Sequence, residues 1–187
     1  MKPLVKIGVS ACLLGEHVRY DGGHKYNRSI TETLGEFFTL VSVCPEVGCG
    51  LPVPREAMQL EGGTAAPRLM TIHTRIDKTE QMLTFCSIRV KELESIDISG
   101  FVFKERSPSC GLSSVPLHDN AAPGLLTVGL FAAAVAGCFQ QMPTEEAERL
   151  ENPMIRKTFI ESVLQYSHEK NARRKDSGDN PPQPKTE

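Results

Sequence analysis

Three cysteines stand where their thiols could act together. Cys12, Cys44 and Cys110 each follow a short apolar segment, at the place where a β-strand would end. Open α/β sheets bind their ligands outside the carboxyl ends of their strands. Thiols delivered there from three separate connections would converge on one point. Three thiols without an obligatory fourth partner favour a metal ion or an iron–sulfur centre that keeps one coordination position open.

The spacing of these cysteines narrows the kind of centre. No two of them are close in sequence, whereas structural zinc sites use paired C-x-x-C segments and ferredoxins use compact cysteine runs. A cubane cluster held by three dispersed thiolates fits better, and its fourth iron would act as a Lewis acid. The alternative is that the cysteines are buried apolar filler. The Pro-Glu pair after Cys44 and the Ser-Pro-Ser segment before Cys110 favour ligation, because filler in a buried strand does not need polar loops with proline.

The other cysteines are weaker candidates. Cys49 lies five residues after Cys44. As a fourth ligand it would close the site and indicate electron transfer or a structural role, but we favour a loop thiol that lies near the centre without binding it. Cys86 and Cys138 fall on the apolar faces of expected helices, where cysteine behaves as a small hydrophobic side chain. We therefore expect both to be core filler.

Polar residues beside the cysteines are candidates for proton transfer. Glu46 follows Cys44 by two residues and would lie beside the centre, where a partly buried carboxylate could move protons. It could equally be a solvated loop residue or a helix cap. Ser107 and Ser109 flank Pro108, and their hydroxyls could bind a substrate or a cluster sulfide. Serines in a turn also commonly cap the backbone. We take Glu46, Ser107 and Ser109 as the candidate catalytic residues.

A second polar group follows the first cysteine. Arg19, Tyr20 and Asp21 form a dense cluster soon after Cys12. The planar guanidinium of Arg19, or that of Arg55, could hold a carbonyl, a carboxylate or a phosphate. Either arginine could equally form a surface ion pair. We take these four residues, Arg19, Tyr20, Asp21 and Arg55, as candidate substrate-binding residues.

The elements that position these residues alternate between strand and helix. Apolar runs predict strands at 5–9, 40–43 and 98–103, and a short strand within 70–75. Helical spacing of apolar residues predicts helices at 30–38, 78–93 and 124–139 and a last helix from Asn152-Pro153. Prolines and glycines predict a loop at 44–54, and a Gly/Ala/Pro-rich segment predicts another at 61–68.

This order predicts right-handed crossovers and a parallel sheet. We therefore expect an α/β fold of three layers, with a mostly parallel, Rossmann-like or flavodoxin-like sheet and helices on both faces. The expected organisation is an α/β domain over 1–150, a C-terminal helix over 151–169 and a disordered tail over 170–187, which is charged and poor in apolar residues. No G-x-G-x-x-G follows the first strand, which argues against a dinucleotide site.

Composition bounds the remaining function classes. The chain has 187 residues, of which 40% are hydrophobic and 24% charged, and its net charge is −2. These values predict one globular domain and give no electrostatic reason for a dominant nucleic-acid surface. No segment approaches the roughly 20 apolar residues that span a bilayer, so we expect a cytoplasmic protein without a membrane partner. Its six cysteines are then metal ligands, reactive thiols or filler rather than disulfides.

Taken together, the motifs of this chain resemble those of the thiouracil desulfidase (TudS) family. The resemblance runs from about residue 5 to 135 and depends on separated motifs that occur in the family's order. These motifs are Ser-Ala-Cys-Leu-Leu-Gly at 10–15, Val-Arg-Tyr-Asp-Gly at 18–22, Val-Cys-Pro-Glu at 43–46, Gly-Leu-Pro-Val-Pro-Arg at 50–55 and Lys-Glu-Arg-Ser-Pro-Ser-Cys-Gly at 104–111.

The resemblance implies a specific chemistry. The implied activity removes sulfur from 2- or 4-thiouracil, or from their nucleosides, and gives uracil and sulfide without net electron transfer. The implied cofactor is a 4Fe–4S cluster on Cys12, Cys44 and Cys110, whose open iron is Lewis acid and sulfur acceptor. An acidic residue and a serine are implied in activating water and protonating the base. Glu46 fits the first role, and Ser107 or Ser109 fits the second.

Residues 145–161 also resemble the junction in longer relatives, which carry a second, all-helical domain and are implied in removing sulfur from thiouridine in transfer RNA. The chain ends soon after this junction, and its net charge is small. We therefore expect a free thiolated base or nucleoside as the substrate, with transfer RNA as the alternative. A further alternative is a non-catalytic iron–sulfur module, which would use Cys49 as a fourth ligand.

Overall fold

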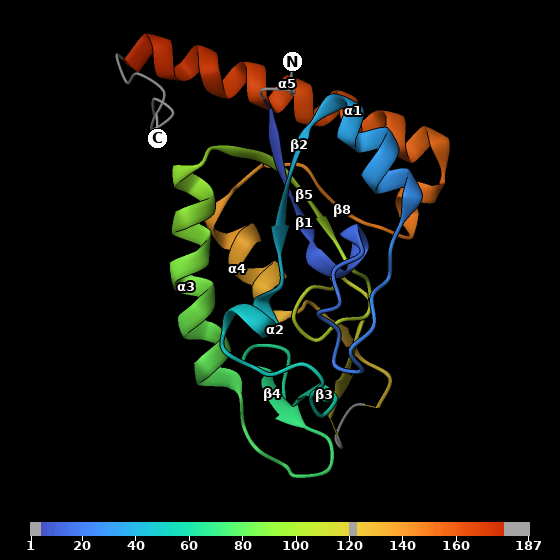
Figure 1. Ribbon diagram of the computed structural model, residues 1–187. Coiled ribbons are helices and arrows are strands. Elements are labelled where there is room, and N and C mark those ends of the chain that lie inside the picture. Colours follow the sequence, from blue (N-terminus) through green and yellow to red (C-terminus); the bar gives the residue numbers. More distant parts are fainter. Residues whose placement is uncertain (1–4, 120–122, 178–187) are drawn as a thin grey trace, which may run out of the picture.

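The computed structural model describes residues 5–119 and 123–177 as a mixed α/β fold with two sheets (Figure 1). The first sheet has the strand order β2-β1-β5-β8, and all its neighbouring strands pair in parallel. Its strands are β1 (Lys6–Ser10), β2 (Thr39–Val43), β5 (Ile98–Phe103) and β8 (Thr144–Glu146). The three strands predicted to precede the cysteines are therefore neighbours, with β1 between β2 and β5.

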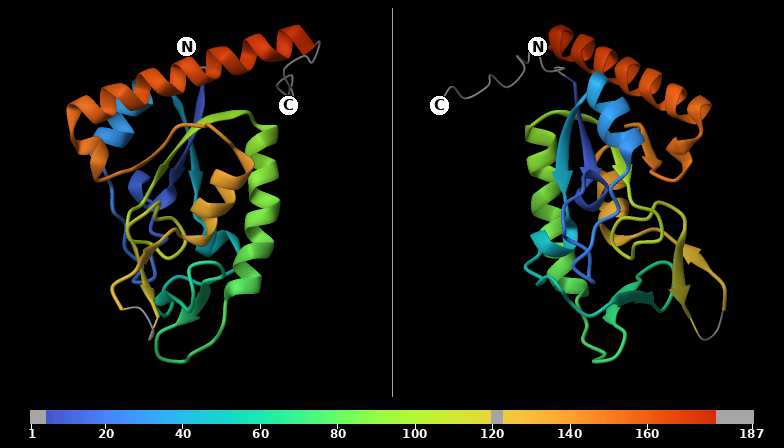
Figure 2. Two further views of the ribbon diagram at one scale, coloured as in Figure 1. Left: turned by 180° about the vertical axis from the view of Figure 1, so that it is seen from behind. Right: turned by 45° about the vertical axis from the view of Figure 1, so that its right-hand side comes forward.

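Helices cover both faces of this sheet, which confirms the predicted three-layer architecture (Figure 2). On one face, α3 (Thr79–Ser95) and α4 (Leu130–Cys138) pack against Phe101 and Phe103. On the other face, Ile7 and Val9 pack against α5 (Pro153–Ser177) and a π-helical turn, η2 (Ser29–Leu34), which continues into the short α1 (Gly35–Phe37). An apolar core on each face therefore holds the sheet. None of the described helices is long and apolar enough to cross a membrane.

The centre of the sheet is closely packed. All six residues of β5 are buried, as expected for a parallel strand with helices on both sides. The Phe101 ring lies across Gly8 of β1, and a Cβ on Gly8 would come within 2.2 Å of that ring. Gly8 is therefore required by close approach rather than by backbone conformation.

Replacing Gly8 with alanine is expected to destabilise the fold. The added methyl would force Phe101 to move within a packed core, which typically costs about 1–3 kcal/mol. A denaturant titration would measure the change, with Gly63→Ala as the control because a Cβ at Gly63 meets nothing within 4 Å. Equal midpoints for the two variants would contradict this packing.

The second sheet lies at the carboxyl end of the first and has the strand order β4-β3-β6-β7 (Figure 1). Its strands are β3 (Met58–Glu61), β4 (Arg68–Thr71), β6 (Val115–His118) and β7 (Leu126–Thr127). The sequence predicted one strand in this region, within 70–75, and β4 begins and ends earlier than that. These segments are too short, at two to four residues, to show a periodicity of their own.

Two predicted boundaries were wrong for local reasons. The predicted loop at 44–54 contains a helix, α2 (Pro45–Gly48), because Pro45 occupies the first turn, where its missing N–H needs no partner. The predicted helix at 124–139 begins only at Leu130, since Gly129 is extended and Leu126–Thr127 form β7.

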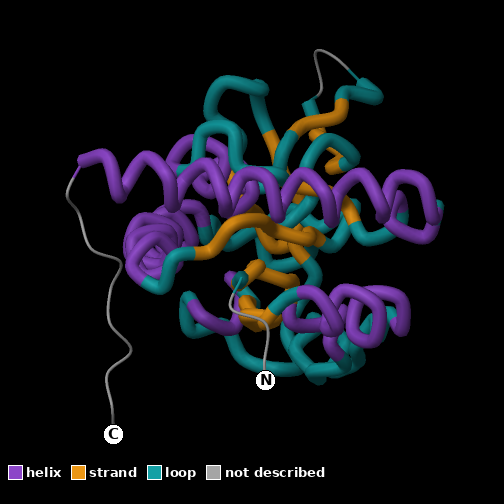
Figure 3. The backbone as a smooth tube through the Cα atoms, turned by 90° about the horizontal axis from the view of Figure 1, so that it is seen from above, coloured by secondary structure: helices purple, strands orange, loops and turns teal. Residues whose placement is uncertain are grey.

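The last helix begins at Pro153 as predicted but continues to Ser177, beyond the predicted end at 169 (Figure 3). The expected disorder of 170–177 was therefore wrong. The Lys170 ammonium donates to the carbonyl of Ile98 at 2.8 Å and to the Ser99 hydroxyl at 2.9 Å, and it pairs with Asp97. These tertiary contacts hold in place a segment whose charged, apolar-poor composition alone predicts disorder. Residues 178–187 of the expected tail lie outside the described residues.

Candidate active site

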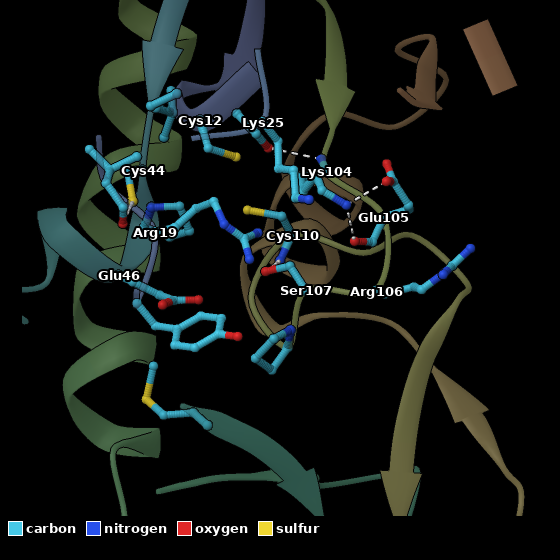
Figure 4. Close-up of a pocket in the computed structure, with 18 of the residues that line it drawn as sticks. Cys12, Arg19, Lys25, Cys44, Glu46, Lys104, Glu105, Arg106, Ser107 and Cys110 are labelled. Atoms are coloured by element: carbon cyan, nitrogen blue, oxygen red, sulfur yellow. Dashed lines mark hydrogen bonds and ion pairs between the residues drawn. The ribbon is translucent and has the colours of Figure 1, made fainter. Parts of the chain in front are cut away.

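A cavity of about 560 Å³ lies at the carboxyl ends of β1, β2 and β5, and Cys12, Cys44 and Cys110 all line it (Figure 4). Cys12 lies in a 3₁₀ turn, η1 (Ala11–Leu14), directly after β1. Cys44 lies between β2 and α2, and Cys110 lies in the loop that follows β5. The structure therefore brings together the three thiols that the sequence singled out.

Strand order explains this convergence. The chain runs from β1 to β2 on one side and then crosses to β5 on the other side of β1. In such sheets the reversal of direction opens a crevice at the carboxyl ends of the strands, and ligands bind there. The three cysteine loops leave the sheet at this crevice.

The three thiols are mutually repulsive as thiolates. Burial and, to a smaller extent, the neighbouring Cys44 raise the pKa of Cys12 to about 11, although Lys104 and Arg19 lower it. Burial also raises the pKa of Cys44 and of Cys110, and Cys12 adds to the shift of Cys110. The free thiols are therefore neutral near pH 7, and a bound metal centre would have to displace their protons.

The arrangement fits a cluster better than a single ion. Within residues 5–119 and 123–177, no three His, Cys, Asp or Glu side chains are placed to hold one metal ion. The three thiols nevertheless line a common cavity. In an iron–sulfur cluster each cysteine thiolate binds a different iron. A cluster therefore suits thiols that surround a wider space than a single ion would fill.

Cys49 does not line this cavity. It follows α2, its thiol donates to the carbonyl of Glu46 at 3.2 Å, and its side chain packs against the core that includes α3. Cys86 is buried in that core as predicted, whereas Cys138 is exposed and is not core filler. Cys138 is the last residue of α4, and the expected helical face ends there.

Glu46 is fixed by two partners from other loops. Arg55 donates to its Oε2 from Nε at 2.8 Å and from Nη2 at 2.5 Å, and the Ser109 hydroxyl donates to its Oε1 at 3.0 Å. Arg55 Nη2 also donates to the carbonyl of Val18 at 2.9 Å. The side chains of Arg55 and Glu46 are only 6% and 14% exposed. Arg55, predicted to bind substrate, thus lines the cavity but directs its donors to the protein.

The two candidate serines have different positions. Ser107 lines the cavity, and its Oγ accepts from the N–H groups of Ser109 at 3.3 Å and Cys110 at 3.1 Å. Within residues 5–119 and 123–177, the Ser107 hydroxyl donates no hydrogen bond of its own. Ser109 is fully buried and uses its hydroxyl on Glu46. Of the two, Ser107 can therefore donate a proton into the cavity, while Ser109 orients Glu46.

Arg19 and Tyr20 line the cavity, but Asp21 does not. Asp21 accepts the N–H of Gly23 at 3.0 Å and pairs with Arg19 at 3.3 Å. The Arg19 guanidinium also lies 5.4 Å from the centre of the Tyr20 ring. The structure therefore places Asp21 behind Arg19, where it orients the guanidinium.

Several cavity residues were missed by the sequence reasoning. They include Lys25, Met58, Lys104, Glu105, Arg106 and Glu148. Lys104 and Glu105 form an ion pair at the cavity wall, and Arg106 pairs with Glu148 at 3.1 Å. The motif before Cys110 contains Lys104, Glu105 and Arg106, so its charged residues could have been singled out. Met58, on β3 of the unpredicted sheet, gave no signal of its own.

Comparison with known proteins agrees with this fold and site. Residues 7–147 match the family described as 2-thiouracil desulfurase. This chain therefore belongs to the 2-thiouracil desulfurase family. A relative from Bacillus subtilis (strain 168), named uncharacterized protein YbbK, is 32% identical over 108 residues, which cover 55% of this chain and 71% of that protein.

A solved structure titled [4Fe-4S]-dependent thiouracil desulfidase TudS has a similar fold. Its TM-score is 0.62 at 26% sequence identity, and the match covers 82% of this chain and 98% of that chain. The family, the class of enzyme and the α/β fold predicted from the sequence are therefore confirmed.

Proposed function

We propose that this protein is a 4Fe–4S-dependent desulfidase of thiolated pyrimidines. Its substrates would be 2- or 4-thiouracil or their nucleosides, and its products uracil, or the corresponding nucleoside, and sulfide. The observation that carries this proposal is the convergence of Cys12, Cys44 and Cys110 on one cavity in a chain of this family. The similar structure whose title names a 4Fe–4S cluster supports it. The proposal includes a cytoplasmic location, where thiols stay reduced.

Cys12, Cys44 and Cys110 would hold the cluster, and Cys49 would not, because it packs against the α3 core. When bound, a cluster with three protein ligands supplies an open iron, a Lewis acid for the soft sulfur of a thiocarbonyl. The remaining cavity wall would bind the pyrimidine. The Tyr20 ring offers a face for stacking, and the Arg19 guanidinium can donate to a carbonyl oxygen.

Glu46 and Ser107 would move the protons. Exchange of sulfur for oxygen consumes one water and releases sulfide, so protons are transferred but no net electrons. In this proposal the Glu46 carboxylate takes a proton from the attacking water and later releases it to solvent or to the leaving sulfide. The Ser107 hydroxyl passes a proton to the pyrimidine and regains one from solvent. Arg55 and Ser109 keep the carboxylate in place.

The substrate class is tested by a panel under anaerobic conditions. Cluster-loaded protein would be given 2-thiouracil, 4-thiouracil, their nucleosides and thiolated transfer RNA, and sulfide release would be measured. We expect release from a free base or nucleoside. Release from transfer RNA alone would move the proposal to RNA repair, and a loaded cluster without release from any substrate would leave a non-catalytic module.

Arg55→Lys and Arg19→Lys are expected to affect different kinetic constants. A lysine at 55 lacks the planar guanidinium that donates from two nitrogens to Glu46 and also reaches the Val18 carbonyl. We therefore expect kcat to fall about tenfold, with KM little changed, for a lost charge-assisted hydrogen bond. A lysine at 19 should instead raise KM, because Arg19 would hold the substrate. Steady-state kinetics of the two variants measure this difference, and a KM effect of Arg55→Lys alone would assign Arg55 to substrate binding.

A further inference from the structure

Glu146 is a buried carboxylate outside the cavity. It is the last residue of β8 and is 7% exposed. Its Oε1 accepts the N–H of Leu112 at 2.8 Å and the hydroxyl of Ser114 at 2.7 Å. A carboxylate is costly to bury unless its hydrogen bonds are satisfied. Both donors lie in the segment that directly follows Cys110, which links this carboxylate to the third cysteine.

The three cysteines differ in how closely a strand supports them. Cys12 comes two residues after the end of β1, and Cys44 directly follows β2. Cys110 comes seven residues after Phe103, the last residue of β5. The sheet therefore positions the first two thiols directly, whereas the third needs anchors within its own loop.

The amino end of α4 anchors residues 108–111 of this loop. The N–H of Leu130 donates to the carbonyl of Pro108 at 3.1 Å, and that of Phe131 donates to the carbonyl of Ser109 at 2.9 Å. A Cβ on Gly129 would lie 2.5 Å from the carbonyl carbon of Ser109, so α4 approaches the loop too closely for any side chain there. The N–H of Gly129 also donates to the carbonyl of Gly111 at 2.7 Å, so the anchors from α4 extend to Gly111 and leave residues 112–114 to be held by another element.

We propose that Glu146 is the positioning residue for the Cys110 thiol. It holds Leu112 and Ser114 from a rigid platform, because Glu146 pairs with Phe103 at the end of β5. With α4 on one side and Glu146 on the other, the loop is formed before any cluster binds. The inference rests on the proposed function only in taking Cys110 as a cluster ligand.

Amide hydrogen exchange of the metal-free protein tests the anchoring step. In Glu146→Ala we expect exchange at 112–114 to rise on the order of tenfold, as for a lost buried hydrogen-bond partner. Glu146→Gln keeps an acceptor oxygen and should restore most of the protection. Glu161→Ala is the control, because Glu161 lies exposed on α5 and pairs with Lys157 on the same helix.

Iron uptake tests the consequence for the site. After anaerobic reconstitution below the melting temperature of each variant, we expect less iron per chain in Glu146→Ala and recovery in Glu146→Gln. Unchanged exchange at 112–114, a rise shared by the whole chain, or full iron uptake by Glu146→Ala would each overturn the proposal.

The proposal stays testable if Glu146→Ala does not fold. Ser114→Ala removes one of the two donors to Glu146 and should loosen the same segment more weakly. Wild-type protein that takes up no iron would refute the proposed function and the ligand role of Cys110, while the exchange experiment would still decide whether Glu146 anchors the loop.

Discussion

Cys110→Ser is expected to abolish both cluster binding and turnover. The hydroxyl is close in size to the thiol but is a hard ligand with little affinity for iron in a cluster. The side chain lines the cavity together with the thiols of Cys12 and Cys44, so two ligands would remain. Iron and sulfide content after anaerobic reconstitution, together with the charge-transfer absorbance, measure the loss. Full iron content with full activity would show that Cys110 is not a ligand.

Cys49→Ser is the matched control for this experiment. We expect it to keep its cluster and its activity, because Cys49 packs against the core of α3 instead of lining the cavity. Loss of the cluster in Cys49→Ser would indicate four-cysteine ligation and a closed site. That outcome would favour a non-catalytic iron–sulfur module over an enzyme.

Glu46→Gln is expected to keep its cluster and lose most of its turnover. Glutamine has nearly the same shape and can still accept from Ser109, but it cannot take a proton from water. Removal of a general base typically costs at least about 100-fold in rate. Single-turnover kinetics at equal iron content measure the effect. A rate equal to that of the wild type would remove Glu46 from the mechanism and leave it a structural partner of Arg55.

The central strands could be predicted from the sequence because their burial leaves a local pattern. All of β5 is buried, and its apolar run spans the predicted 98–103. The second sheet left no such pattern, since β7 has two residues and is placed by its pairing with β6. The end of α5 also depends on tertiary contacts, because Lys170 is satisfied by groups 71–73 residues away in sequence.

The same distinction applies to the site. The cysteines could be singled out because each follows a strand, and strand order alone brings their loops together. The roles of Arg55 and Glu146 could not be predicted. Arg55 reaches Val18 across 37 residues, and Glu146 reaches Leu112 across 34. Such contacts depend on how loops pack, and side-chain type does not encode them.

The most direct test of the central claim is the balance of products formed by cluster-loaded protein under anaerobic conditions, without any added reductant or oxidant. Thiouracil would be supplied in excess, and uracil and sulfide would be counted per chain. We expect equal amounts of uracil and sulfide over many turnovers. The Cys110→Ser variant, taken through the same reconstitution, should form neither product. A loaded cluster that releases sulfide only with an electron donor, or not at all from any thiolated pyrimidine, would contradict the account.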